Sequence, residues 1–177
     1  MNRNITVFCS ASADLSSKYT KLAEKVGELL ARSKANLVYG GDKCGLMGVI
    51  AITMKKNSKV VIGVCIDKMF REGRFYERCD DIILTENLAE RKQKMIELSD
   101  TIIVMPGGIG TINEFLEVIV LIHLKQIKRK VIVVNYENFF DELFLFIENL
   151  IRKGFVSQEI NNSFYVVKEV DEVQLYL

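Results

Sequence analysis

The best candidate in this sequence for a binding or catalytic site is residues 106–114, Pro-Gly-Gly-Ile-Gly-Thr-Ile-Asn-Glu. An apolar run at 100–105 precedes it and predicts a buried strand, and residues 115–120 continue it as a predicted helix. Glycines let the backbone turn sharply and approach a ligand closely, and the first N–H groups of a helix attract anions. This strand-loop-helix corner therefore predicts a phosphate-binding site.

Two charged residues could supply chemistry beside that phosphate. We expect Glu114 in the first turn of the helix, where its carboxylate could orient water or stabilise positive charge. Arg91, on a helix predicted over 87–99, could hold a phosphate or a leaving group. Cleavage of a glycosidic bond passes through an oxocarbenium-like transition state and uses such a carboxylate. Glu117, one turn beyond Glu114, could bind ribose hydroxyls.

Periodicity also supports simpler interpretations of the same residues. Arg91 and Lys92 fit the solvated face of an amphipathic helix, which is the usual position of such charges. Gly40 and Gly41 could form only a tight turn, because such turns are common in α/β proteins. His123, the one histidine, lies in an apolar helix and is better explained by packing or an interface than by catalysis. The residues alone leave these alternatives open.

Strands and helices alternate over the whole chain. Strands are predicted at 5–9, 37–39, 59–65, 81–85, 100–105, 130–135 and 164–167, and helices at 19–30, 49–55, 87–99, 115–124 and 139–152, with a loop and short helix at 67–78. This alternation predicts an α/β fold, a doubly wound and mostly parallel sheet with helices on both faces. Small-residue corners at Ser10, Gly40 and Pro106 each follow a strand. We expect them at one edge of the sheet, where such folds bind ligands.

Composition sets the class of protein. A chain of 177 residues with 49% hydrophobic content predicts one domain, 1–177. Lys and Arg number 24 against 23 Asp and Glu, so no global field attracts nucleic acid or an anionic membrane, and we expect neither partner. Residues 1–4 lead straight into a strand, and no apolar run reaches the ~20 residues of a membrane helix. We therefore expect a cytoplasmic protein.

Several cofactor and metal classes lack support in the sequence. The four cysteines, Cys9, Cys44, Cys65 and Cys79, form no CxxC pair, so we expect reduced thiols and no metal site, with the first three acting as small buried hydrophobes. Neither glycine corner has the GxGxxG spacing of dinucleotide sites or the GxxxxGK[ST] pattern of triphosphate hydrolases. A monophosphate is the favoured ligand.

These motifs together resemble the Lonely Guy family, cytokinin riboside 5′-monophosphate phosphoribohydrolases that were once regarded as lysine decarboxylases. The resemblance covers about Ile5 to Phe155 and rests on the PGGxGTxxE stretch at 106–114, Glu90-Arg91-Lys92, Val38-Tyr39-Gly40-Gly41, Gly45-Leu46-Met47-Gly48, and Val7-Phe8-Cys9 with Ser12. It implies a Rossmann-like fold. It also implies hydrolysis of the N-glycosidic bond of purine nucleoside 5′-monophosphates, such as AMP or cytokinin riboside monophosphates, to free base and ribose 5-phosphate without a cofactor.

The resemblance also assigns residues. Arg91 and Glu114 correspond to the catalytic pair. The phosphate would be bound by Gly107, Gly108, Gly110, Thr111 and Ser12, and the rest of the substrate by Lys92, Glu117, Gly40, Gly41 and Leu88. Members form homodimers or larger homo-oligomers with the site near the subunit interface, and the apolar helix at 115–124 could be buried there.

Two departures from the family pattern affect base recognition. Leu88-Ala89 stands where many members have Met-His, and Val120-Leu121-Ile122-His123 stands where they have Thr-Trp-Ala-Gln. Lysine decarboxylation is not supported, because nothing in the chain identifies a pyridoxal phosphate site with a Schiff-base lysine. The alternative that remains is a nucleotide-binding or carrier protein of the same fold that does not hydrolyse its ligand.

Overall fold

The computed structural model describes residues 3–177, so the first two residues of the expected domain 1–177 lie outside it. Its centre is a seven-stranded sheet in the order β4-β3-β2-β1-β5-β6-β7, and every neighbouring pair is parallel. The strands are β1 (Asn4–Phe8), β2 (Asn36–Tyr39), β3 (Val61–Ile66), β4 (Asp81–Thr85), β5 (Thr101–Val104), β6 (Lys130–Val134) and β7 (Tyr165–Val167). The predicted parallel α/β sheet is confirmed.

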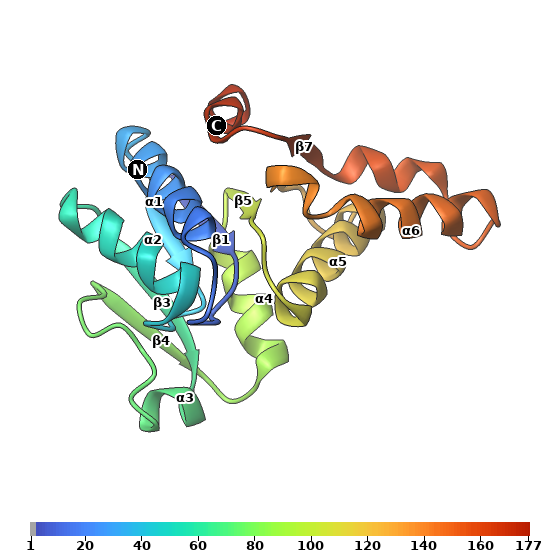
Figure 1. Ribbon diagram of the computed structural model, residues 1–177. Helices are drawn as coiled ribbons and strands as arrows, with labels where there is room; N and C mark the ends of the chain where they lie inside the picture. Colours follow the sequence, from blue (N-terminus) through green and yellow to red (C-terminus); the bar gives the residue numbers. More distant parts are fainter. Residues whose placement is uncertain (1–2) are drawn as a thin grey trace.

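Helices cover both faces of this sheet (Figure 1). They are α1 (Ser17–Arg32), α2 (Gly45–Lys56), α3 (Asp67–Arg71), α4 (Leu88–Leu98), α5 (Ile109–His123) and α6 (Asp141–Arg152), with 3₁₀ turns η1 (Tyr136–Asn138), η2 (Gln158–Ser163) and η3 (Val170–Tyr176). Alternate residues of β5 show why both faces are needed: Ile103 packs with α1 and α2, whereas Ile102 and Val104 pack with α4 and α5.

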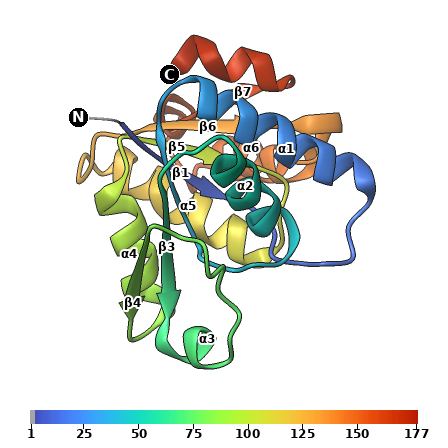
Figure 2. The same ribbon diagram turned by 90° about the vertical axis from the view of Figure 1, so that its left-hand side faces the viewer.

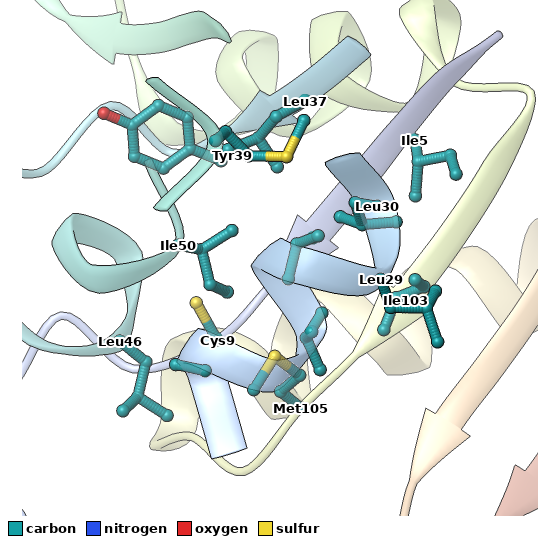
Figure 3. Packing of buried hydrophobic residues seen from close by; sticks show 14 of the residues in the cluster. Ile5, Cys9, Leu29, Leu30, Leu37, Tyr39, Leu46, Ile50, Ile103 and Met105 are labelled. Carbon is teal, nitrogen blue, oxygen red and sulfur yellow. The ribbon is translucent and has the colours of Figure 1, made fainter. Parts of the chain in front are cut away.

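The first of the two cores lies between β1, β2, β5 and the helices α1 and α2. Figure 3 shows Leu29 and Leu30 of α1 and Ile50 of α2 beside strand residues such as Ile5 and Ile103. All five side chains are at most 3% exposed. This packing fixes the ends of β1 and β2, and with them the loops that follow.

The order in which strands are added to the sheet switches from one side of β1 to the other. From β1 the chain builds outward through β2, β3 and β4, and it then returns to place β5 on the other side of β1. Phe8 is in register with Val104, so the loops after β1 and β5 leave the sheet side by side. Ligands bind at such switch points, and the expected gathering of the small-residue corners at one edge is confirmed.

Two helices begin at least one full turn earlier than the apolar periodicity predicts. α2 begins at Gly45 instead of Val49, and α5 begins at Ile109 instead of Phe115. The expectation that Glu114 lies in the first turn of its helix is therefore wrong, because it is the sixth residue of α5. Ile109 and Gly110 at the start of α5 are exposed, so they add nothing to an apolar stripe. In α2 the prediction took Gly45 to Gly48 as a loop, although Leu46 packs in the core.

The segment after β3 forms α3 and a loop, as predicted for 67–78. Figure 2 shows α3 at the carboxyl end of β3. The loop is tied to the glycine corner after β2, because Arg74 Nη2 donates to Asp42 Oδ2 at 2.7 Å and the Lys43 N–H donates to the Arg74 carbonyl at 3.0 Å. Asp42 is 1% exposed, so this contact holds the loop against the corner.

The four cysteines are all free thiols that differ in exposure, and Cys79 is half-buried. Cys9 and Cys65 are buried, as predicted, but the prediction for Cys44 is wrong because this residue is exposed. Cys44 is the N-cap residue of α2 and belongs to the loop at the sheet edge instead of a strand. No helix within residues 3–177 has the length and apolar character needed to cross a membrane.

Candidate active site

The centre of the candidate site is an ion pair between Arg91 of α4 and Glu114 of α5. Arg91 Nη1 lies 3.2 Å from Glu114 Oε1, and the two residues are only 6% and 5% exposed. Helical spacing explains their burial: Arg91 is one turn from Met95 and Glu114 one turn from Val118, and both of these pack in the core. The interpretation of Arg91 as a solvated surface charge is therefore wrong.

Arg91 contacts β3, α5 and the loop that follows β2. Its Nε donates to the Val64 carbonyl of β3 at 2.9 Å, while Nη1 meets Glu114. A Cβ atom added to Gly40 would lie 1.9 Å from Arg91 Nη2, so the guanidinium rests directly on the Gly40 backbone. Asn87 begins α4 by accepting a hydrogen bond from the Glu90 N–H at 3.0 Å, which sets where Arg91 projects.

Burial makes Glu114 more basic than an ordinary glutamate. Removal of the carboxylate from water raises its pKa above the usual 4.5, although the charge of Arg91 and its hydrogen bond act in the opposite direction. Burial also raises the pKa of the Cys9 thiol, and the nearby negative charge of Glu114 raises it further. The site thus combines a carboxylate able to accept a proton with a thiol that stays protonated.

The N-terminus of α5 is open toward a ligand. Its N-cap residue is Gly108, so no side chain caps the first N–H groups of the helix. A Cβ atom placed on Gly108 or Gly110 would meet no atom within 4 Å. The N-terminus of α2 differs, because the N–H groups of Leu46 and Met47 already donate to the Ser10 carbonyl. Only the α5 end, of these two, is free to bind an anion.

A cavity of about 250 Å³ brings these features together. Its lining consists of Cys9, Ser10, Ala11, Met47, Arg91, Gly108, Gly110, Thr111 and Glu114. The glycine loop and the Arg91–Glu114 pair, predicted from separate parts of the sequence, thus face the same space. The arrangement can hold an anion at α5 and place a buried carboxylate beside the group attached to it.

Comparison with known proteins shows the family to which this chain belongs. A family described as possible lysine decarboxylase matches residues 47–177. Cytokinin riboside 5′-monophosphate phosphoribohydrolase of Rhodococcoides fascians is 33% identical over 171 residues, which are 96% of this chain and 86% of that protein. The chain belongs to the Lonely Guy family. A second member, LOG3 of Arabidopsis thaliana, with the same enzyme name, is 32% identical over 88% of this chain and 72% of its own length.

The fold extends beyond the Lonely Guy family. The molybdenum cofactor binding protein from the phototrophic bacterium Rippkaea orientalis superposes with a TM-score of 0.72, covering 99% of this chain and 96% of that protein. The two sequences are 19% identical, so the likeness shows a shared Rossmann-like architecture.

The structure also shows where the other residues assigned by the Lonely Guy resemblance lie relative to the Arg91–Glu114 pair. Thr111 is buried and lines the cavity, and Gly107 packs against it, since an added Cβ would lie 2.2 Å from Thr111 Oγ1. Gly40 and Gly41 are buried beneath Arg91 and Cys65, respectively.

Ser12, Leu88, Lys92 and Glu117 are not in the lining of the cavity that holds Arg91 and Glu114, which we call the catalytic cavity because of its candidate role. Leu88 is 58% exposed at the start of α4. Lys92 forms an ion pair with Glu117 and donates to Asn113 Oδ1 at 2.7 Å, and Glu117 lines a separate cavity between α4 and α5. The direct substrate contacts expected of these residues stay predictions.

Other features of the site have no clear signal in the sequence. The Val64 carbonyl is a backbone group, and only its place in β3, one residue beyond the pairing of Gly63 with Tyr39, reveals it. An apolar cavity of about 260 Å³ shares Ser10 and Gly108 with the catalytic cavity and also contains Ser12. Its apolar walls come from distant segments, namely Leu15, Tyr19, Leu46, Pro106 and Phe139.

Proposed function

We propose that this protein hydrolyses the N-glycosidic bond of purine nucleoside 5′-monophosphates, such as AMP or cytokinin riboside monophosphates. The products are the free base and ribose 5-phosphate. One observation carries the proposal: a buried carboxylate, Glu114, shares a cavity with an uncapped, glycine-lined helix N-terminus. The names of the relatives support the same reaction.

The reaction needs the two halves of the site in different steps. The N–H groups of the first turn of α5, with Thr111, bind the 5′-phosphate and so place the ribose over Glu114. As the C1′–N bond breaks, its electrons leave with the base and positive charge develops on the ribose, where the Glu114 carboxylate stabilises it. Water then bonds to C1′, one proton from that water passes to Glu114 and from there to solvent, and the nitrogen released from C1′ takes up one proton from solvent.

Arg91 supports this chemistry by keeping Glu114 in place. Its guanidinium donates to the carboxylate and to the Val64 carbonyl, so the carboxylate cannot rotate away from the cavity without breaking that contact. Within the part of the chain that the structure describes, the catalytic cavity has no lysine in its lining. Schiff-base chemistry of the kind that lysine decarboxylation needs is therefore disfavoured.

We further propose that a second copy of the chain covers the outer face of α5 and that residues 1–177 act as one nucleotide-binding unit. Leu116, Val120 and Leu124 recur every four residues on this helix and are 36%, 48% and 58% exposed. Ile109, at the start of the same helix beside the phosphate loop, is 82% exposed. An interface on α5 would therefore bring the partner close to the substrate. The cytoplasmic location expected from the sequence stays a prediction.

A substrate series tests the proposed reaction. The purified protein is incubated with AMP, with isopentenyladenosine monophosphate and with adenosine, which lacks the phosphate. Release of free base from the two nucleotides, with little release from adenosine, is the expected result because the phosphate supplies the binding energy. Tight binding of both nucleotides without base release would instead support the non-hydrolysing carrier. Failure to bind either one would overturn both functions.

A further inference from the structure

The guanidinium of Arg91 lies in a small recess that we call the Arg91 socket, formed by the Gly40 backbone, the Val64 carbonyl and the Glu114 carboxylate. Arg91 Nε is 2.9 Å from the Val64 oxygen and Nη1 is 3.2 Å from Glu114. The third side is closed by proximity, because a Cβ atom on Gly40 would lie 1.9 Å from Nη2. Each of the three guanidinium nitrogens therefore lies against a different segment of the chain.

The topology explains why the socket forms at this place. Gly40 directly follows β2, and Val64 lies in β3, the parallel neighbour of β2. α4 returns from β4 and passes over the ends of these strands, so the long side chain of Arg91 reaches down between them. The backbone of Gly40 does not have a positive φ, so the close approach of Arg91, and not turn geometry, is what demands a glycine here.

We propose that Gly40 is a positioning residue that fixes the guanidinium of Arg91 against Glu114. This inference rests on the proposed function and assigns Gly40 an indirect role in place of substrate contact. A methyl group at position 40 must push Arg91 Nη2 away, because the two atoms cannot stand 1.9 Å apart. The other close neighbours of that methyl group, Met47 Cε and Sδ at 3.0 Å, belong to the flexible end of a side chain and can move aside.

A double-mutant cycle in stability tests the socket without any substrate. Gly40→Ala is made in the wild type and in Arg91→Ala, and the midpoint of urea unfolding is measured. The wild-type background should show a lower midpoint. In Arg91→Ala the same change should have no effect or raise the midpoint slightly, because the clash is gone and alanine restricts the unfolded chain. If Gly40→Ala does not fold, recovery of folding in the double variant is the same result.

Gly63→Ala is the matched control, because Gly63 lies in β3 opposite Tyr39, and its added methyl would meet Cys79 and Gly41 instead of Arg91. Its effect on the midpoint should be the same in both backgrounds. Equal effects of Gly40→Ala in the two backgrounds would overturn the socket.

Activity and its pH dependence give the second readout. Gly40→Ala should lower kcat for AMP at least 10-fold with a smaller change in KM, and it should have no further effect in Arg91→Ala. Displacement of Arg91 in Gly40→Ala and its loss in Arg91→Ala both weaken the positive charge that lowers the pKa of Glu114, so the acid limb of the pH profile should move to higher pH in both variants. The other groups near Glu114, namely Cys9, Lys92 and Glu117, are unchanged in these variants.

The two readouts separate the socket from the proposed function. A coupled stability cycle with no base release by any variant supports the socket and contradicts the reaction. Base release by the wild type with an additive cycle, unchanged kcat and an unshifted pH profile in Gly40→Ala supports the reaction and contradicts the socket.

Discussion

At the scale of single residues, Glu114 carries the proposed chemistry. Glu114→Gln keeps the size and a hydrogen-bond acceptor for Arg91 but cannot accept a proton or stabilise positive charge. We expect base release from AMP to fall by about 100-fold or more while nucleotide affinity stays within a few fold. Steady-state kinetics and a binding titration measure the two. Glu24→Gln is the control and should change neither quantity, because Glu24 is exposed on α1 and no part of the site includes it.

The raised pKa of Glu114 also predicts how stability varies with pH. Between 4.5 and its native pKa, Glu114 keeps its proton in the folded protein but loses it in the unfolded chain. Folding therefore binds a proton in this window, and the free energy of unfolding contributed by this group falls as pH rises through it. The free energy of unfolding of the wild type minus that of Glu114→Gln is measured by urea unfolding at several pH values. This difference should decrease from below pH 4.5 toward neutrality. An increase over that range would show that Arg91 outweighs burial.

At the scale of elements, the N-terminus of α5 should bind phosphate through its backbone. Gly110→Ala should leave the fold intact, since the new methyl meets no protein atom within 4 Å, and can stabilise the helix by up to about 1 kcal/mol. Because Gly110 lines the cavity, the methyl group should occupy part of the space proposed for the phosphate. Calorimetric titration with AMP should therefore show at least 10-fold weaker binding beside an unchanged or higher unfolding midpoint.

Gly107→Ala provides the contrast for the same loop. Its added Cβ would lie 2.2 Å from Thr111 Oγ1, so this variant should lose stability as well as affinity. Equal affinity for AMP in Gly110→Ala and the wild type would contradict a phosphate site at the N-terminus of α5.

The sequence predicted strands and helices well where their side chains pack in the core. It predicted them poorly where the structure depends on backbone contacts. All seven strands were recognisable from apolar runs, and the corners of the site from their glycines. The start of α5 was missed because Ile109 and Gly110 are exposed and give no apolar stripe, and the start of α2 was missed because its glycines were interpreted as a loop although Leu46 packs in the core. The pairing of Arg91 with Glu114 was suggested by residue type, but its burial and the roles of Gly40 and Val64 depend on neighbouring parallel strands.

At the scale of the whole molecule, the exposed apolar face of α5 predicts self-association. Val120→Glu places a charge at the centre of that face, and we expect light scattering to report a monomer for this variant and a dimer or larger assembly for the wild type. Leu145→Glu on α6, where Leu145 is 47% exposed, is the control and should leave the α5 interface in place. A monomeric wild type at micromolar concentration would contradict the proposed interface.

The fold alone does not decide the function, because the same architecture occurs in a molybdenum cofactor binding protein. The decisive features are local: the buried Arg91–Glu114 pair and the open N-terminus of α5 in one cavity. Membership of the Lonely Guy family agrees with them.

The most direct test is to identify the products formed from AMP. Chromatography of the reaction should show adenine and ribose 5-phosphate in equal amounts, formed by the wild type and lost in Glu114→Gln. Adenosine with inorganic phosphate would mean that the phosphate ester is cleaved instead. That result, or unchanged adenine release by Glu114→Gln, would contradict the central claim that Glu114 drives cleavage of the N-glycosidic bond.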